Sequence, residues 1–144
     1  MDSKEMAPGD IERRSFEIIT EELGGRTFPP LEEPVVKRVI HTTADFSYAD
    51  SLVFTHDAAH CALDALRAGA TVLTDTNMAL AGISKPALVV GVPVGFVNVV
   101  EAKEGLLARR VPAIVARGRK GGSTVAAAIM NALLYQITRT GGPK

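Results

Sequence analysis

Three cationic side chains and three glycines lie together in one short segment between two apolar stretches. The apolar run 111–116 predicts a buried strand, and it leads directly into residues 117–123, RGRKGGS. The Ala-rich stretch 124–134 that follows is typical of a helix. Glycines let backbone amides approach a ligand, and a helix start offers unpaired N–H groups with partial positive charge. The segment therefore predicts a binding site for an acidic ligand.

The residues expected to hold that ligand are the cations, the last two glycines and the serine of this segment: Arg117, Arg119, Lys120, Gly121, Gly122 and Ser123. A solvated surface turn is the alternative. A binder of phosphate or nucleotides is disfavoured, because the segment matches neither GxxxxGK[S/T] nor GxGxxG.

His41 is the candidate for proton chemistry, because imidazole titrates near neutral pH. Arg38 lies three residues earlier on the same face of a predicted helix, where its guanidinium could bind a carboxylate in bidentate fashion. A cap at the C-terminus of that helix is the alternative for His41. His56 and His60 have the spacing of a metal pair, but only Asp57 lies nearby to complete a site, so a helix turn is favoured over a metal centre.

Composition limits the remaining function classes. The chain has 144 residues, of which 47% are hydrophobic, and this predicts one globular domain over residues 1–144. Sixteen basic residues balance sixteen acidic ones and aromatic residues are few, so a nucleic-acid binder is disfavoured. The apolar runs are too short for a membrane helix, and the polar N-terminus does not resemble a signal peptide. We expect a cytoplasmic protein, with residues 1–9 and 138–144 flexible.

Helical and extended patterns alternate along the chain. Apolar residues at helical spacing predict helices over 11–23, 34–41, 60–68, 99–109 and 124–134, with 54–59 leading into the third. Short, β-branched apolar runs predict buried parallel strands over 71–74, 87–92 and 111–116. The predicted fold class is α/β, with three α/β/α layers around a short, mainly parallel sheet.

Ligands of such sheets bind at the carboxyl ends of the strands. Asp75–Asn77 follow the first predicted strand, Pro93–Phe96 follow the second and the basic segment follows the third. We therefore expect all three segments at one rim. Thr76 and Asn77 could hydrogen-bond a ligand there, or they could cap the next helix.

Five short motifs follow one another in a fixed order. They are Arg38–His41 (RVIH), Thr74–Met78 (TDTNM), Gly91–Val97 (GVPVGFV), Glu101–Glu104 (EAKE) and Arg117–Ser123 (RGRKGGS). In this order they closely resemble the precorrin-8X methylmutases (cobalt-precorrin-8 methylmutases) of cobalamin biosynthesis. The resemblance spans about residues 11–135, and the five motifs together are highly specific although none would suffice alone.

The resemblance implies an isomerase that moves a methyl group between adjacent ring carbons of a tetrapyrrole, yielding hydrogenobyrinate or its cobalt counterpart, cobyrinate. It implies that His41 is the catalytic proton donor and that Ser15 and Arg38 contact substrate. The alternative for Ser15 is that it is a polar residue on a helix surface with no role in binding. The family further implies a homodimer that needs no metal ion or organic cofactor of its own.

One part of the family pattern is absent. In the family, two further strand and helix units precede the strand before the GVPVGF motif, whereas here Gly82–Lys85 joins Pro86–Leu88 directly. We expect a reduced version of the family fold that lacks an internal segment near residues 83–86. The shortened pocket leaves a second hypothesis open, a non-catalytic tetrapyrrole-binding or carrier module derived from the enzyme.

Overall fold

The computed structural model describes residues 7–70 and 88–141, with backbone only for 139–141. Its sheet has the strand order β1-β3-β2, formed by Leu52–Thr55, Ala113–Ala116 and Val89–Gly91. β2 runs parallel to β3, and β1 runs antiparallel to it. The described part of the sheet is therefore mixed.

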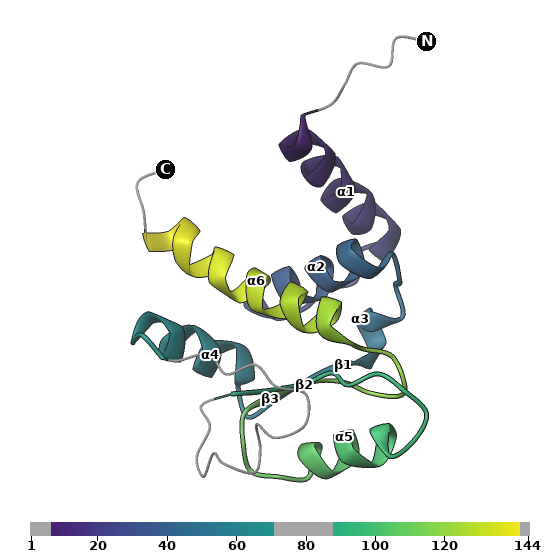
Figure 1. The fold of residues 1–144 in the computed structure, drawn as a ribbon. Coiled ribbons are helices and arrows are strands. Elements are labelled where there is room, and N and C mark those ends of the chain that lie inside the picture. Colours follow the sequence, from purple (N-terminus) through teal and green to yellow (C-terminus); the bar gives the residue numbers. More distant parts are fainter. Residues whose placement is uncertain (1–6, 71–87, 142–144) are drawn as a thin grey trace.

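Helices cover both faces of this sheet, as Figure 1 shows. The helices are α1 (Pro8–Leu23), α2 (Glu33–Thr43), α3 (Tyr48–Ser51), α4 (Ala58–Arg67), α5 (Val99–Leu107) and α6 (Ser123–Gly141). α5 lies on one face, whereas α2, α4 and α6 lie on the other, and α1 packs on α2 and extends away from the sheet. The predicted α/β class is confirmed, with helices on both sides of the described strands.

The core is organised around β3, whose four residues are all completely buried. Successive side chains of a strand point to opposite faces. Ile114 accordingly packs in the large apolar cluster beneath α2, α4 and α6, whereas Val115 packs with Leu106 of α5. Burial on both faces of the sheet thus explains why every residue of β3 is apolar.

Local sequence places the start of each predicted helix within three residues of the observed start, whereas α6 continues to Gly141, seven residues past its predicted end and into the segment expected to be flexible. α2 has Pro34 in its first turn, where the missing N–H costs nothing. α1 ends at Gly24, whose φ of +61° is the left-handed conformation that glycine adopts without a steric penalty. The predicted parallel strands over 87–92 and 111–116 correspond to β2 and β3, joined through α5.

Two features of the sheet differ from the sequence prediction. Residues 54 and 55 are not a lead-in to a helix, because Phe54 and Thr55 pair with Ile114 and Ala113 as part of β1. This unpredicted antiparallel strand is the reason that the described sheet is mixed rather than mainly parallel. The strand predicted over 71–74 lies outside the described residues.

Candidate functional site

The side chains of Ser15 and His41 meet where α1 crosses α2. The Ser15 hydroxyl lies 2.6 Å from Nδ1 of His41, and both side chains are half-buried. Ser15 therefore contacts the predicted catalytic histidine, an arrangement that the sequence alone does not predict. A hydroxyl at one ring nitrogen fixes the orientation of the imidazole and leaves the opposite nitrogen, Nε2, for other contacts.

The ring of Phe16 joins this pair to Arg38. The Phe16 ring stacks on the His41 imidazole, with centroids 5.1 Å apart, and the Arg38 guanidinium lies 5.0 Å from the Phe16 centroid. Arg38 also lies 4.8 Å from the Tyr135 ring of α6 and donates a hydrogen bond to Glu12. Arg38 and His41 thus belong to one aromatic and charged cluster, as their helical spacing predicts.

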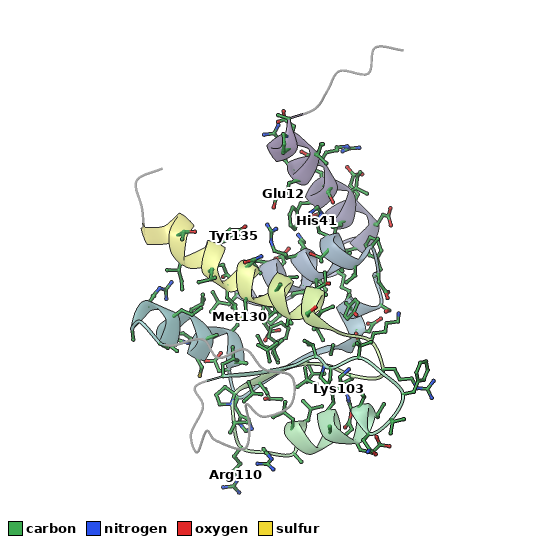
Figure 2. All side chains as sticks on the ribbon, in the orientation of Figure 1. Glu12, His41, Lys103, Arg110, Met130 and Tyr135 are labelled. Carbon is green, nitrogen blue, oxygen red and sulfur yellow. The ribbon has the colours of Figure 1, made fainter. Side chains whose placement is uncertain are left out.

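Two grooves adjoin this cluster on either side of α1. The larger has a volume of about 780 Å³ and is lined by Arg38, Phe16 and Tyr135 among others. The smaller, about 350 Å³, is lined by Ser15 and His41 together with apolar residues of α1 and α2. Glu12, His41 and Tyr135 mark this region in Figure 2, where α1, α2 and α6 converge.

The basic segment follows β3 as a loop over residues 117–122 and leads into α6. It lies beside the segment that follows β2, because the Gly95 N–H donates to the Arg119 carbonyl at 3.1 Å and the Gly122 N–H donates to the Val92 carbonyl at 2.6 Å. The prediction that these two strand-end segments share a rim is confirmed. Asp75–Asn77, including Thr76 and Asn77, lie outside the described residues.

A close backbone approach at Gly121 holds the two loops together. A Cβ atom added to Gly121 would lie 2.1 Å from the Val92 carbonyl oxygen and 2.8 Å from that of Pro93. Only glycine fits at such a separation. This glycine therefore has a packing role in addition to the ligand-binding role that the sequence predicts for it.

Two of the three loop cations are held by carboxylates of the protein. Arg117 makes a bidentate ion pair with Glu104, with both N···O distances at 2.9 Å. Lys120 donates to Asp45 at 2.5 Å and to Ser47 at 2.9 Å, which ties the loop to the segment after α2. These contacts reduce the positive charge that the sequence predicts for the loop.

Arg119 is arranged differently from the other two cations. Its guanidinium lies 5.1 Å from the centroid of Phe96, a ring that is 83% exposed. No carboxylate of the described residues forms an ion pair with Arg119. Arg119 is thus the loop cation best placed to meet an external carboxylate.

Lys103 is a buried cation that sequence reasoning overlooked. Its side chain is 1% exposed, and its ammonium group donates to the carbonyls of Gly118 and Lys120, both at 2.8 Å. The sequence carries only a weak signal for this burial, which is that Lys103 lies three residues before Leu106, on the stripe of α5 that is buried.

The protein environment shifts the pKa of several groups around the loop. The hydrogen bond from Lys120 lowers the pKa of Asp45 to about 2. The hydrogen bond from Arg117 lowers the pKa of Glu104, and burial lowers the pKa of Lys103. Burial, followed by the charge of Asp45, raises the pKa of Tyr48. The carboxylates that hold the loop therefore stay ionised further into the acid range than free carboxylates do.

The helical cluster and the basic loop are linked by a short piece of chain. Asp45, the partner of Lys120, lies four residues after His41. Within the described part of the chain, neither groove beside α1 is lined by a residue of the loop 117–122. The structure therefore brings Ser15, Arg38 and His41 together and forms a second cluster from the loop and its partners.

Neither a metal cluster nor a membrane-spanning helix is found among residues 7–70 and 88–141. His60 lies between Asp57 and Asp64 on α4, at 3.3 and 3.4 Å, while the backbone of His56 is in the turn that precedes this helix.

The fold and these two clusters define an α/β protein with a histidine–serine pair between helices and a cationic loop at the end of the parallel strands. The family model described as CbiC, precorrin-8X methylmutase, matches residues 10–86 and 84–136. The chain belongs to the precorrin-8X methylmutase family. The two matched pieces meet where the sequence predicts an absent segment.

Individual relatives agree with the family match. The cobalt-precorrin-8 methylmutase of Salmonella typhimurium is 36% identical over 201 aligned positions, which cover 90% of this chain and 96% of that protein. The precorrin-8X methylmutase of Pseudomonas aeruginosa is 58% identical over 55 residues, 37% of this chain and 26% of that protein. The solved precorrin-8X methylmutase of Thermus thermophilus superposes with a TM-score of 0.81 at 32% identity, covering 93% of this chain and 98% of that one.

The chain is shorter than these relatives. The alignment with the Salmonella enzyme is longer than the 144 residues present here, so that enzyme has positions with no counterpart in this chain. The predicted resemblance and the predicted shortening are both confirmed.

Proposed function

We propose that this chain catalyses the isomerisation of its family, the migration of a methyl group between adjacent ring carbons of precorrin-8X or cobalt-precorrin-8. The products are hydrogenobyrinate and cobyrinate, respectively. The observation that carries the proposal is the family match, which extends over residues 10–136 and includes the segments that form both clusters. The reaction needs no net transfer of atoms to or from the protein, so the protein must position the ring and stabilise charge.

His41 is the proposed proton donor. Its contact with Ser15 supports this role, because Nδ1 is engaged at 2.6 Å and the imidazole is held from one side while Phe16 stacks on its face. Nε2 is then the nitrogen that donates a proton or a hydrogen bond to a macrocycle nitrogen. Protonation polarises the conjugated system and lowers the barrier to the methyl shift.

The loop 117–122 and the start of α6 are proposed to bind the carboxylate side chains of the macrocycle. Arg119 supplies the direct charge, and Arg117 and Lys120 contribute through the positive potential that remains after pairing with Glu104 and Asp45. Gly121 and Ser123 contribute backbone N–H groups at the helix start, and Gly122, whose N–H is held by the Val92 carbonyl, is proposed to shape the loop beside them. Arg38 is proposed to contact a carboxylate beside His41, and Thr76 and Asn77 are proposed to complete the rim.

A homodimer is part of the proposal, because the two clusters line no common groove within one described subunit. A second copy would supply the wall that the shorter chain lacks and bring a loop against the other subunit's His41. We further propose a cytoplasmic location and no resident cofactor.

The shorter chain favours one competing function, a tetrapyrrole-binding module without turnover. Incubation of the protein with precorrin-8X, followed by absorption spectroscopy and chromatography of the pigment, separates the two. Conversion to hydrogenobyrinate supports the isomerase. Saturable binding with an unchanged pigment contradicts it and supports the carrier.

A further inference from the structure

Lys103 is the largest fully buried side chain of the described residues, and it carries a charge. Its exposed fraction is 1%, and the other residues buried to this degree in the described ranges are apolar. Transfer of an ammonium group from water into a protein interior is costly unless a partner of opposite charge compensates. A residue that served only to fill this space would be expected to be apolar.

No described carboxylate compensates the charge of Lys103. The neighbouring carboxylate, Glu104, is occupied by Arg117, and Asp45 is occupied by Lys120. Instead, the ammonium group donates to two backbone carbonyls, those of Gly118 and Lys120, at 2.8 Å each. Both carbonyls belong to the basic loop, so within the described residues the hydrogen bonds that offset the cost of burying the cation all go to that loop.

Lys103 reaches the loop from the opposite side of the sheet from His41. It extends from α5, whereas His41 lies on α2 among the helices of the other face, as Figure 2 shows. The two carbonyls that it binds flank Arg119 in sequence, and Arg119 itself is exposed beside Phe96. Holding the carbonyls on both sides of Arg119 fixes the backbone from which that guanidinium extends.

We infer that Lys103 is a positioning residue for substrate binding, which holds the basic loop in the conformation that presents Arg119 and the start of α6 to carboxylates of the tetrapyrrole. This inference rests on the proposed function for its ligand. The position of the loop itself is a property of the protein alone and can be measured without substrate.

The test is the Lys103→Met variant, which keeps an unbranched side chain of similar length and removes the charge and the donors. The matched control is Arg110→Met, which removes one cation from an exposed position. Arg110 precedes β3 whereas the loop follows it, and Figure 2 places Arg110 far from Lys103 beyond α5. Both variants have the same net charge.

The first measurement is amide hydrogen exchange of peptides covering residues 117–122. Lys103→Met is expected to accelerate exchange there about tenfold, because two charge-assisted hydrogen bonds that oppose local opening are lost. Exchange in the interior of α6 and the thermal midpoint are expected to stay close to those of the wild type. Unchanged exchange in the loop, or faster exchange throughout the protein, overturns the inference.

The second measurement is steady-state kinetics with precorrin-8X. Lys103→Met is expected to raise KM about tenfold with kcat nearly unchanged, because the loop binds carboxylates away from the reacting carbons. Arg110→Met is expected to leave both values unchanged. An unchanged KM, or an equal loss in kcat together with a lowered thermal midpoint, contradicts a positioning role.

The two proposals fail in different ways. If the wild-type protein neither binds nor converts precorrin-8X, the proposed function is wrong, and the exchange experiment still decides whether Lys103 fixes the loop. If the wild type converts precorrin-8X and Lys103→Met does so with wild-type KM and wild-type exchange, only the role of Lys103 is wrong.

Discussion

The hydroxyl of Ser15 and Nδ1 of His41 lie 2.6 Å apart although the two residues are 26 positions apart in the sequence. The contact joins α1 to the last turns of α2, and Phe16 closes over the imidazole from the same helix as Ser15. The N-terminal helix thus supplies the surroundings of the proposed proton donor. Variants of α1 therefore test the mechanism without changing His41 itself.

Ser15→Ala is expected to lower kcat about tenfold, because one hydrogen bond of about 0.5–1.5 kcal/mol that orients the imidazole is lost. The pH dependence of kcat is expected to change with it. Thr138→Ala is a matched control, since among the described residues this exposed hydroxyl bonds only to the Tyr135 carbonyl of its own helix. Wild-type kcat and an unchanged pH profile in Ser15→Ala would show that the contact does not serve the reaction.

Arg119→Ala is expected to weaken substrate binding more than Arg117→Ala does. Arg117 is bound by Glu104, whereas Arg119 forms no ion pair with a carboxylate of residues 7–70 or 88–141. A hydrogen bond to a charged group contributes about 1.5–3 kcal/mol, so KM should rise about tenfold or more in Arg119→Ala. The kinetic constants of both variants with precorrin-8X provide the measurement. A larger KM effect for Arg117→Ala would reverse the assignment.

Gly121→Ala is expected to separate the two strand-end loops. The added Cβ would lie 2.1 Å from the carbonyl oxygen of Val92, a backbone atom directly after β2 that can move only together with the chain around it. We expect a loss of about 1–3 kcal/mol in the free energy of unfolding, measured by urea denaturation.

The control for this variant is Gly105→Ala, on the exposed side of α5, where a Cβ meets nothing within 4 Å. Alanine there should raise the free energy of unfolding by about 0.5–1 kcal/mol, because glycine is a poor helix former. Equal effects of the two variants would mean that the loops are not closely packed at Gly121.

The pair between Asp45 and Lys120 is expected to make stability depend on pH in the acid range. The pKa of Asp45 is about 2 in the folded protein, below its ordinary value of 3.8. The unfolded chain binds more protons between these values, so the contribution is present above about pH 4 and is lost as the pH falls through 2. The Lys120 side chain is 57% exposed, and we therefore expect less than about 1 kcal/mol.

Urea denaturation of the wild type and of Asp45→Asn at several acid pH values measures this contribution. The difference in free energy of unfolding should grow between about pH 2 and pH 4 and stay constant above. A difference that does not vary with pH would indicate that Asp45 is not held by Lys120.

Features set by local sequence were predictable. The glycine after α1, the proline in the first turn of α2 and the apolar residues of β3 each act within a few positions of the chain. A short helical crossover favours parallel pairing of the two strands that it joins. Parallel pairing of β2 and β3 places their carboxyl ends at the same edge of the sheet, so the shared rim was predictable as well.

Features set by tertiary contacts were not predictable from these patterns. β1 has four residues, and only its pairing with β3 distinguishes it from the approach to α4. Lys103 is polar, and polar residues of a helix are normally assigned to solvent, so its burial follows only from the loop carbonyls that it meets. The pairing of Arg117 and Lys120 with carboxylates likewise depends on residues remote in sequence.

The proposed role of His41 is tested most directly by the turnover of precorrin-8X by wild-type protein, His41→Ala and, as a control, His60→Ala. His60 is exposed on α4, and its ion pairs in the described part of the chain are with aspartates. We predict conversion by the wild type and by His60→Ala, and saturable binding of the pigment without conversion by His41→Ala. Conversion by His41→Ala at the wild-type rate would contradict the assignment of His41 as the proton donor.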